Sequence, residues 1–289
     1  MADTVPEHYV TEFTSNWISR VQQSESRLGD FVTWEDFNGS RKRYDRIDQI
    51  AAQAIAARKA ATRVTDASDD FRWCTAQAYD STQTLDEFDD KQLGNLVLPT
   101  SDYIMQHAKE YHRTYDDMTW AAAIGNAISG DNGLATTALP AAQKLTTGGA
   151  LTVEKLIEAG RVLDEADLDN NEGRVITWTA KMKAQLLRTA KATSSDYVGQ
   201  IQSLVSGDID HLVGFKFRQI QRLPVVSGTT KKMIGWQVGA LKGIKGEKKS
   251  HLDIIPEFQH MLQVRSVWRG GLVRMHDELV VELHIDEEA

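Results

Sequence analysis

The apolar positions between Pro99 and Gly130 recur at steps of three and four, which is the spacing of one stripe on an α-helix. Ser101 suits the N-cap because its hydroxyl can accept a hydrogen bond from a first-turn amide, and Gly130 suits the stop. No proline interrupts the run. The sequence therefore predicts one helix over residues 101–129, roughly 40 Å long at about 1.5 Å per residue. The stripe comprises Ile104, Ala108, Tyr111, Tyr115, Met118, Ala122 and Gly125.

A helix of this length could belong to a bundle or coiled coil, but no second helix of matching length follows it. Its C-terminal half also carries apolar residues on the remaining faces, among them Trp120, Ala121 and Ile124. We therefore expect that half to be buried nearly all round. This pattern favours a single long strut over a bundle.

The segment before this helix is predicted to form an extended hairpin. Strand-like runs at residues 31–37 and 40–47 flank Asn38-Gly39, a pair that favours tight hairpin turns because both residues tolerate positive φ. The second run is too charged for a core strand, and an isolated hairpin is marginally stable. We therefore expect a neighbouring subunit to cover it, with pairing to acidic residues near 86–90. The candidate intersubunit contacts are Phe31, Trp34, Phe37, Arg41, Arg43 and Arg46.

Short elements of both kinds follow the long helix, after a loop expected over residues 131–149. Thr152 and Thr179 can each cap a helix, and a strand is expected between them at residues 174–178. Alternating apolar residues predict a further strand at 211–218. The chain then closes with a predicted hairpin of strands 271–275 and 279–286. This mixture indicates the α+β class.

Composition narrows the class of protein. The chain has 289 residues, 41% of them hydrophobic, and a net charge of −8. The acidic balance argues against a general nucleic-acid binder. No apolar run reaches the roughly 18–20 residues that a membrane helix needs, and the first residues lack a leader pattern. Cys74 is the only cysteine, which excludes an intrachain disulfide.

Charge is unevenly spread along the chain. Six lysines lie within residues 231–249, and six carboxylates without a basic residue lie within residues 277–288. Two interpretations stay open: each run is a solvated surface, or the opposite patches meet on neighbouring copies of the chain.

No catalytic, cofactor or metal motif is recognisable. Residues 167–171 begin like a calcium loop, but Glu172 stands where glycine is needed and Trp178 where glutamate is needed. His107 and His112 are five residues apart and so do not share a helix face. We therefore predict no catalytic residue, no cofactor and no metal ligand.

Taken in order, several segments resemble the major capsid proteins of tailed bacteriophages, which have the Hong Kong 97-like fold. The order and spacing of the segments carry the resemblance over most of the chain. They are residues 13–28, 113–116, 121–125, 162–166, 174–178, 183–187, 207–210, 213–217, 223–224, 269–274 and 280–283.

This resemblance implies a division of the chain. The expected parts are an N-terminal arm (1–29), an E-loop region (30–82), a P-domain (83–148) with the spine helix 101–129, an A-domain (149–268), and a C-terminal hairpin (269–289) that returns to the P-domain.

The resemblance also implies a structural function: hexamers and pentamers of an icosahedral shell around packaged double-stranded DNA, contacted non-specifically. The expected partners are further copies of the chain, a separate scaffolding protein, a portal and decoration proteins, without a membrane. The expected location is the virion capsid, after synthesis in the host bacterial cytoplasm. An encapsulin-like compartment shell is the first alternative, and a soluble α+β enzyme with a scattered active site is the second.

Overall fold

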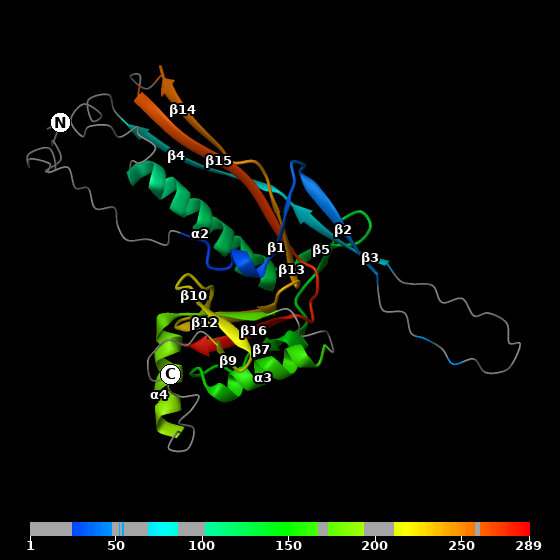
Figure 1. Cartoon of the computed structure of the whole chain (residues 1–289). Helices are drawn as coiled ribbons and strands as arrows, with labels where there is room; N and C mark the ends of the chain where they lie inside the picture. Colours follow the sequence, from blue (N-terminus) through cyan, green and yellow to red (C-terminus); the bar gives the residue numbers. More distant parts are fainter. Residues whose placement is uncertain are drawn as a thin grey trace, which may run out of the picture. The chain divides into compact units, whose positions relative to one another are not determined.

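The computed structural model describes residues 25–47, 52, 54, 69–85, 102–166, 173–193, 211–257 and 261–289. Most of the expected arm, the acidic residues near 86–90 and the Ser101 cap lie outside these residues. The chain divides into two compact units. Unit 1 comprises residues 1–26, 78–115 and 247–269, and unit 2 comprises residues 27–77, 116–246 and 270–289. Helices and strands occur together, as the α+β class requires (Figure 1).

A seven-stranded mixed sheet forms the centre of unit 2. Six strands follow one another in space, and a seventh, β11 (Val225–Ser227), pairs with the start of β12. β16 runs parallel to β7 and antiparallel to β12, whereas β8 and β10 run parallel. The six are β7 (Lys144–Leu145), β16 (Val280–Asp286), β12 (Thr230–Gln237), β8 (Arg174–Trp178), β10 (Phe215–Gln219) and β9 (His211–Leu212).

Helices α3 (Val153–Asp164) and α4 (Ala180–Thr193) pack on one face of this sheet. Thr152 caps α3 by accepting from the Lys155 amide at 3.4 Å, as predicted. Thr179 accepts from the Met182 amide in the same way. Apolar residues of both helices then pack against alternate strand residues such as Met233.

The other face of the sheet is also covered, which is why its strands are apolar at successive positions. Ile176 faces the α3 and α4 side, whereas its neighbour Val175 lies in a second core cluster. Trp236 is fully buried in that second cluster and donates from its indole to the Phe31 carbonyl at 3.0 Å. Ala123 of the long helix joins this second cluster.

The predicted hairpin across Asn38-Gly39 is wrong. β1 (Thr33–Asp36) pairs in parallel with β13 (Leu241–Lys245), whereas β2 (Arg41–Ile47) pairs with β3 (Asp69–Thr75). Neither Asn38 nor Gly39 has the positive φ that the turn would require. A Cβ on Gly39 would lie 2.4 Å from the Phe37 ring, so a larger residue there would force that ring to move.

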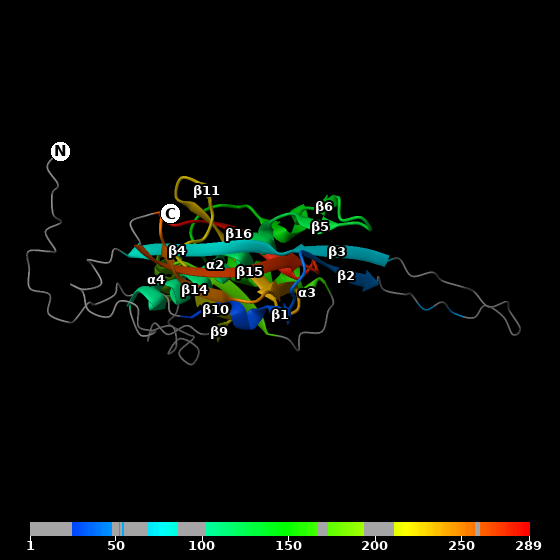
Figure 2. The same cartoon turned by 90° about the horizontal axis from the view of Figure 1, so that it is seen from above.

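Strand β3 continues the pairing into a four-stranded sheet with β5 (Ala127–Ser129) and β6 (Ala135–Thr137), in the order β2-β3-β5-β6. β5 pairs antiparallel with β3 and with β6, and both short strands lie alongside the β2–β3 hairpin in Figure 2. Two of these short strands therefore replace parts of the predicted helix 101–129 and of the predicted loop 131–149.

Two other predicted connections differ from the structure. The expected strand 211–218 is a tight hairpin of β9 and β10, because Val213 and Gly214 both have positive φ, 52° and 77°. The expected C-terminal hairpin does not form, since β15 (Met261–Arg274) pairs with β13 and β14, whereas β16 joins the seven-stranded sheet. Val281, Leu283 and Ile285 of β16 alternate onto the face that packs on α3 and α4, but Val280 and Glu282 on its other side are buried as well.

The long helix α2 spans Asp102–Ile124, five residues fewer at its end than predicted. Gly125 donates to the Ala121 carbonyl at 2.9 Å, and the chain then turns into β5. Ala121 itself is exposed, so the C-terminal half of α2 is not buried all round within this chain. None of the described helices is long and apolar enough to cross a membrane.

Unit 1 contains β4 (Gln77–Leu85), β14 (Lys249–Ile255), most of β15 and the first part of α2. β15 pairs with β4 and antiparallel with β14. Aromatic rings join β15 to α2 and to β4. The centre of the Trp268 ring in β15 lies 5.6 Å from that of Tyr111 in α2, edge-on, and 6.3 Å from that of Tyr79 in β4. Tyr115 donates to the Arg269 carbonyl at 3.1 Å.

Candidate assembly surface

The β2–β3 hairpin has one exposed and one buried face. Strand residues alternate between faces, so Arg41, Arg43, Asp45 and Ile47 share the exposed side of β2. Tyr44, between them, is buried. The rest of unit 2 therefore covers one face of β2, and only the other face is exposed.

Cations stack on aromatic rings along the exposed face. The Arg41 guanidinium lies 4.9 Å from the centre of the Trp73 ring, and Arg43 lies 4.6 Å from that of Phe71. Trp73 is the direct cross-strand partner of Arg43, so the side chains form a short ladder across the two strands. This face therefore carries arginines stacked on aromatic rings, with the Asp45 carboxylate 2.9 Å from Arg43.

The turn between β5 and β6 supports this ladder. Arg41 donates to the Gly133 carbonyl at 3.0 Å, and the Trp73 indole donates to the Gly130 carbonyl at 2.8 Å. Both glycines have positive φ, and a Cβ on Gly133 would lie 2.5 Å from the Arg41 guanidinium. The next residue, Leu134, is 86% exposed.

The buried face of the hairpin is held by charge and close contact. Lys42 pairs with Glu35, and this bond is the main cause that lowers the pKa of the Glu35 carboxyl. Burial raises the pKa of the Cys74 thiol to about 12, so the thiol stays protonated at neutral pH. A Cβ on Gly271 of β15 would lie 2.3 Å from the Thr75 carbonyl oxygen, so only glycine allows these strands to approach so closely.

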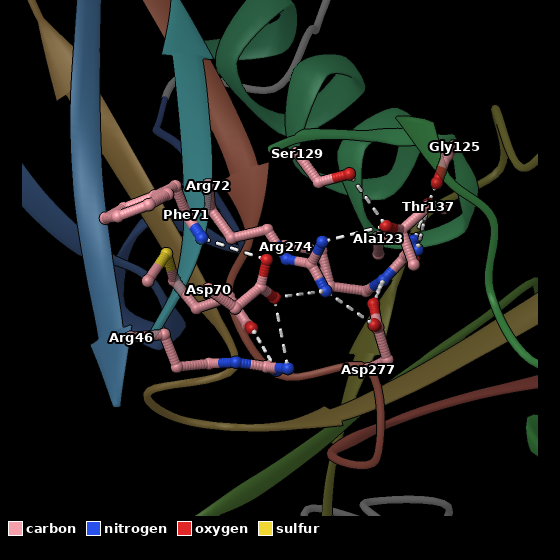
Figure 3. Close-up of polar contacts among 11 residues, drawn as sticks. Arg46, Asp70, Phe71, Arg72, Ala123, Gly125, Ser129, Thr137, Arg274 and Asp277 are labelled. Carbon is pink, nitrogen blue, oxygen red and sulfur yellow. Dashed lines mark hydrogen bonds and ion pairs between the residues drawn. The ribbon is translucent and has the colours of Figure 1, made fainter. Parts of the chain in front are cut away.

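A buried row of alternating charges lies at the base of this face (Figure 3). Arg274 donates to Asp277 at 2.5 Å, and Arg72 contacts the other oxygen of Asp277 at 2.9 Å. Asp70 then lies 3.6 Å from Arg72 and 3.2 Å from Arg46. Arg72, Arg274 and Asp277 are all buried.

The two charge runs noted in the sequence meet within one chain. β12 and β16 are antiparallel neighbours, so Lys231 pairs with Glu287 at 3.2 Å and Lys232 with Glu282 at 2.8 Å. Glu282 is buried, and its bonds to Lys232 and His284 lower the pKa of its carboxyl against the effect of burial. For these residues neither open interpretation holds, because the partners come from the same sheet.

Comparison with known proteins decides the family. Residues 5–287 match the family of phage capsid proteins. The chain belongs to the phage capsid protein family. No curated protein matches the sequence. The match to the phage capsid family confirms the expectation of a structural shell protein of a virion, and not an enzyme.

Solved structures share the fold of this capsid protein along nearly the whole chain. The capsid structure of cyanophage P-SCSP1u matches with a TM-score of 0.72 at 13% identity, covering 96% of this chain and 93% of that one. A structure from Mycobacterium phage Che8 matches with a TM-score of 0.68 at 14% identity, covering 100% and 99%. The α+β fold is therefore that of the Hong Kong 97-like capsid proteins, as predicted.

An encapsulin also has this fold. The SrpI encapsulin of Synechococcus elongatus PCC 7942 matches with a TM-score of 0.61 at 13% identity, covering 98% of this chain and 95% of that chain. Because the family match is to phage capsid proteins, it favours the phage shell over the compartment.

Of the six predicted contact residues of the capsid protein, two are exposed, one is buried and three are half-buried. Arg41 and Arg43 lie on the exposed face. Phe31 is only 6% exposed and belongs to the core, so the prediction that it anchors a neighbour is wrong.

Trp34 and Phe37 are half-buried against their own unit, and Arg46 is held by Asp70 and by the Met275 carbonyl. Sequence reasoning failed here because an aromatic residue in a polar segment looks the same whether its own core or a neighbour covers it.

The sequence interpretation did not assign roles to several residues of this surface. Trp73 and Phe71 were not among the predicted contact residues, although aromatic residues two apart on a strand signal a shared face. Arg72 and Arg274 gave no separate signal, because a buried arginine is recognisable only once its distant carboxylate, Asp277, is placed beside it.

Proposed function

We propose that this phage capsid protein assembles into hexamers and pentamers of an icosahedral shell that encloses packaged double-stranded DNA. The observation that carries the proposal is the match to the capsid family over residues 5–287, together with the full-length likeness to capsid structures. A scaffolding protein, a portal and decoration proteins are the further partners that such a shell would use. The division into arm, E-loop region, P-domain and A-domain is part of the same proposal, without the C-terminal hairpin.

Within this proposal, the β2–β3 hairpin acts as the E-loop and α2 as the spine helix. The exposed face of the hairpin supports its role, because arginines stacked on aromatic rings can contact both carboxylates and apolar groups of another copy of the chain. Trp34 of β1 and Phe37 lie half-buried just before β2 along the chain. Arg46, near the other end of β2, is held by Asp70 and the Met275 carbonyl.

The test is charge reversal on the exposed face alone. R41E/R43E leaves the ion pairs of the buried face in place, so we expect subunits with unchanged circular dichroism that fail to close normal shells by light scattering and electron microscopy. The matched control is R161E/K181E, which reverses two exposed cations on α3 and α4 and should leave assembly intact. Normal shells from R41E/R43E would remove the hairpin from the interface.

A second candidate function, a protein-filled compartment, is favoured by the encapsulin likeness. Native particles purified after nuclease treatment distinguish the two. Protected DNA inside megadalton particles supports the phage shell, whereas a protein cargo without DNA supports the compartment. A small oligomer would overturn both.

A further inference from the structure

The buried charge row joins elements that are distant in sequence. Arg46 and Asp70 come from β2 and β3, Arg72 from β3, and Arg274 and Asp277 from the end of β15 and the turn that follows it (Figure 3). Charges alternate along the row, with three cations and two carboxylates. Every carboxylate therefore touches two arginines.

One end of the row lies at the end of helix α2. The last carbonyls of a helix have no partner within the helix, and they carry its negative dipole end. Arg274 supplies this partner: its guanidinium donates to the Ala123 carbonyl at 2.9 Å and to the Gly125 carbonyl at 2.6 Å. The same guanidinium donates to the Thr137 carbonyl of β6 at 3.0 Å. Arg274 thus fixes where the helix ends relative to the sheet.

The other end of the row lies within the hairpin. Arg46 and Asp70 are direct cross-strand partners, and Arg46 also donates to the Met275 carbonyl at 3.2 Å. Arg72 is the central member, because it bridges Asp70 and Asp277 and also donates to the Thr137 hydroxyl at 2.9 Å. Within the row, Asp277 joins Arg72 to Arg274 and so couples hairpin and helix end, and Thr137 of β6 accepts from both arginines as well.

We propose that Arg72 and Asp277 are positioning residues: they hold the β2–β3 hairpin in a fixed direction relative to the end of α2, and thereby set the angle at which the hairpin meets a neighbouring copy of the chain. The part that concerns the neighbour rests on the proposed function, whereas the fixed direction does not.

The chemistry favours a positioning role over simple stabilisation. A buried ion pair often adds little net stability compared with an apolar pair, but it strongly penalises any arrangement that leaves one charge unpaired. Arginine forks and carboxylates also bond in defined directions. A hairpin swung away from the helix end would strand the Asp277 and Arg72 charges in a buried site, so the row penalises other directions.

The sharpest variant is R72Q, because it cuts the row while leaving the bonds of Arg274 to the helix end and to Asp277. We expect amide hydrogen exchange to speed up in β2 and β3 by about tenfold or more, the factor expected for losing a bond between buried charged groups. Exchange in β8 and β12 should stay unchanged. In electron micrographs, shells of R72Q should have a broader range of diameters.

The matched control is R161Q. Arg161 of α3 also pairs with two carboxylates, but these side chains are exposed and lie outside the hairpin, so its change should alter neither exchange of β2 and β3 nor shell diameter. The variant D277N and the double variant R72Q/D277N complete a cycle. Because both changes act through one bond, the double variant should speed up hairpin exchange by less than the product of the two single effects.

The outcomes separate this inference from the function it builds on. Unchanged exchange of β2 and β3 in R72Q, or fully multiplicative effects in the cycle, would overturn the positioning role whatever the shells look like. Faster exchange with normal shell diameters would keep the fixed direction and overturn its influence on assembly. If R41E/R43E also assembles normally, the proposed interface fails, whereas the exchange result still stands.

Discussion

At the scale of single residues, the buried charge row is compatible with a neutral His276 and less so with a protonated one. His276 lies between Met275, whose carbonyl accepts from Arg46, and Asp277 of the buried row. Burial lowers the pKa of His276 below its ordinary value, and the positive charge of Arg46 lowers it further. A protonated imidazole there would add a cation beside a row that already has three arginines and two carboxylates.

This arrangement predicts that acid weakens the fold. The folded protein binds a proton at His276 less readily than the unfolded chain, so the free energy of unfolding should fall as the pH drops below about 6.5, the ordinary histidine pKa. H276Q should show a smaller fall between pH 7 and 5 in urea unfolding. His107, whose pKa is also lowered by burial, contributes with the same sign, so some fall should remain. H211Q, at an exposed histidine, serves as the control, and equal falls in H276Q and the wild type would refute the assignment.

At the scale of elements, α2 belongs to both compact units, since it spans Asp102–Ile124 and the division falls after Tyr115. Its integrity therefore matters to residues of both units. Tyr115 is 2% exposed and bonds to the Arg269 carbonyl of β15.

We predict that Y115P destabilises the protein by roughly 3 kcal/mol or more, because an interior proline removes a helical hydrogen bond and clashes with the preceding turn. Y115F is the control: it loses only the bond to the Arg269 carbonyl and should cost about 1 kcal/mol. Thermal melting followed by circular dichroism measures both. A Y115P protein that melts like Y115F would show that α2 is not continuous at this point.

Local elements were predictable from the sequence, and their partners were not. The caps at Thr152 and Thr179 and the alternation along β16 depend on neighbouring residues, so periodicity and capping chemistry revealed them. Strand pairing depends on distant residues. β1 does not pair with β2 across Asn38-Gly39 but with β13, some 200 positions away in the chain. The tight turn formed instead at Val213-Gly214, where the valine gave no turn signal.

For the candidate surface, too, features set by neighbouring residues were predictable and features set by distant residues were not. The exposed arginines Arg41 and Arg43 were found because charge on a strand signals a solvent face. Phe31 was misplaced, and Arg274 was missed, because burial is decided by residues far along the chain.

At the scale of the whole molecule, the core is unevenly distributed. The three clusters of buried apolar residues found among the described residues all belong to unit 2. In unit 1, the strand β14 is largely exposed, including Ile254 at 61%. Unit 2 should therefore be the more stable part of an unassembled subunit.

Amide hydrogen exchange of the unassembled subunit tests this expectation. The slowest amides should lie in β8, β12 and β16 of unit 2, and amides of β14 should exchange faster. Assembled shells provide the comparison, since contact with neighbours should slow β14 more than the core strands. Equal protection of β14 and β12 in the free subunit would contradict the uneven core.

The position of β16 has a consequence for synthesis on the ribosome. β16 lies between β7 and β12 in space, yet it follows every other described strand in the chain. While the ribosome is still translating the earlier strands, the central sheet lacks the strand that joins β7 to β12. The core also lacks the apolar side chains of Val281 and Leu283, because β16 has not yet been synthesised. The nascent chain therefore cannot complete its core early, and copies growing side by side on one messenger should become competent to associate only after β16 has emerged.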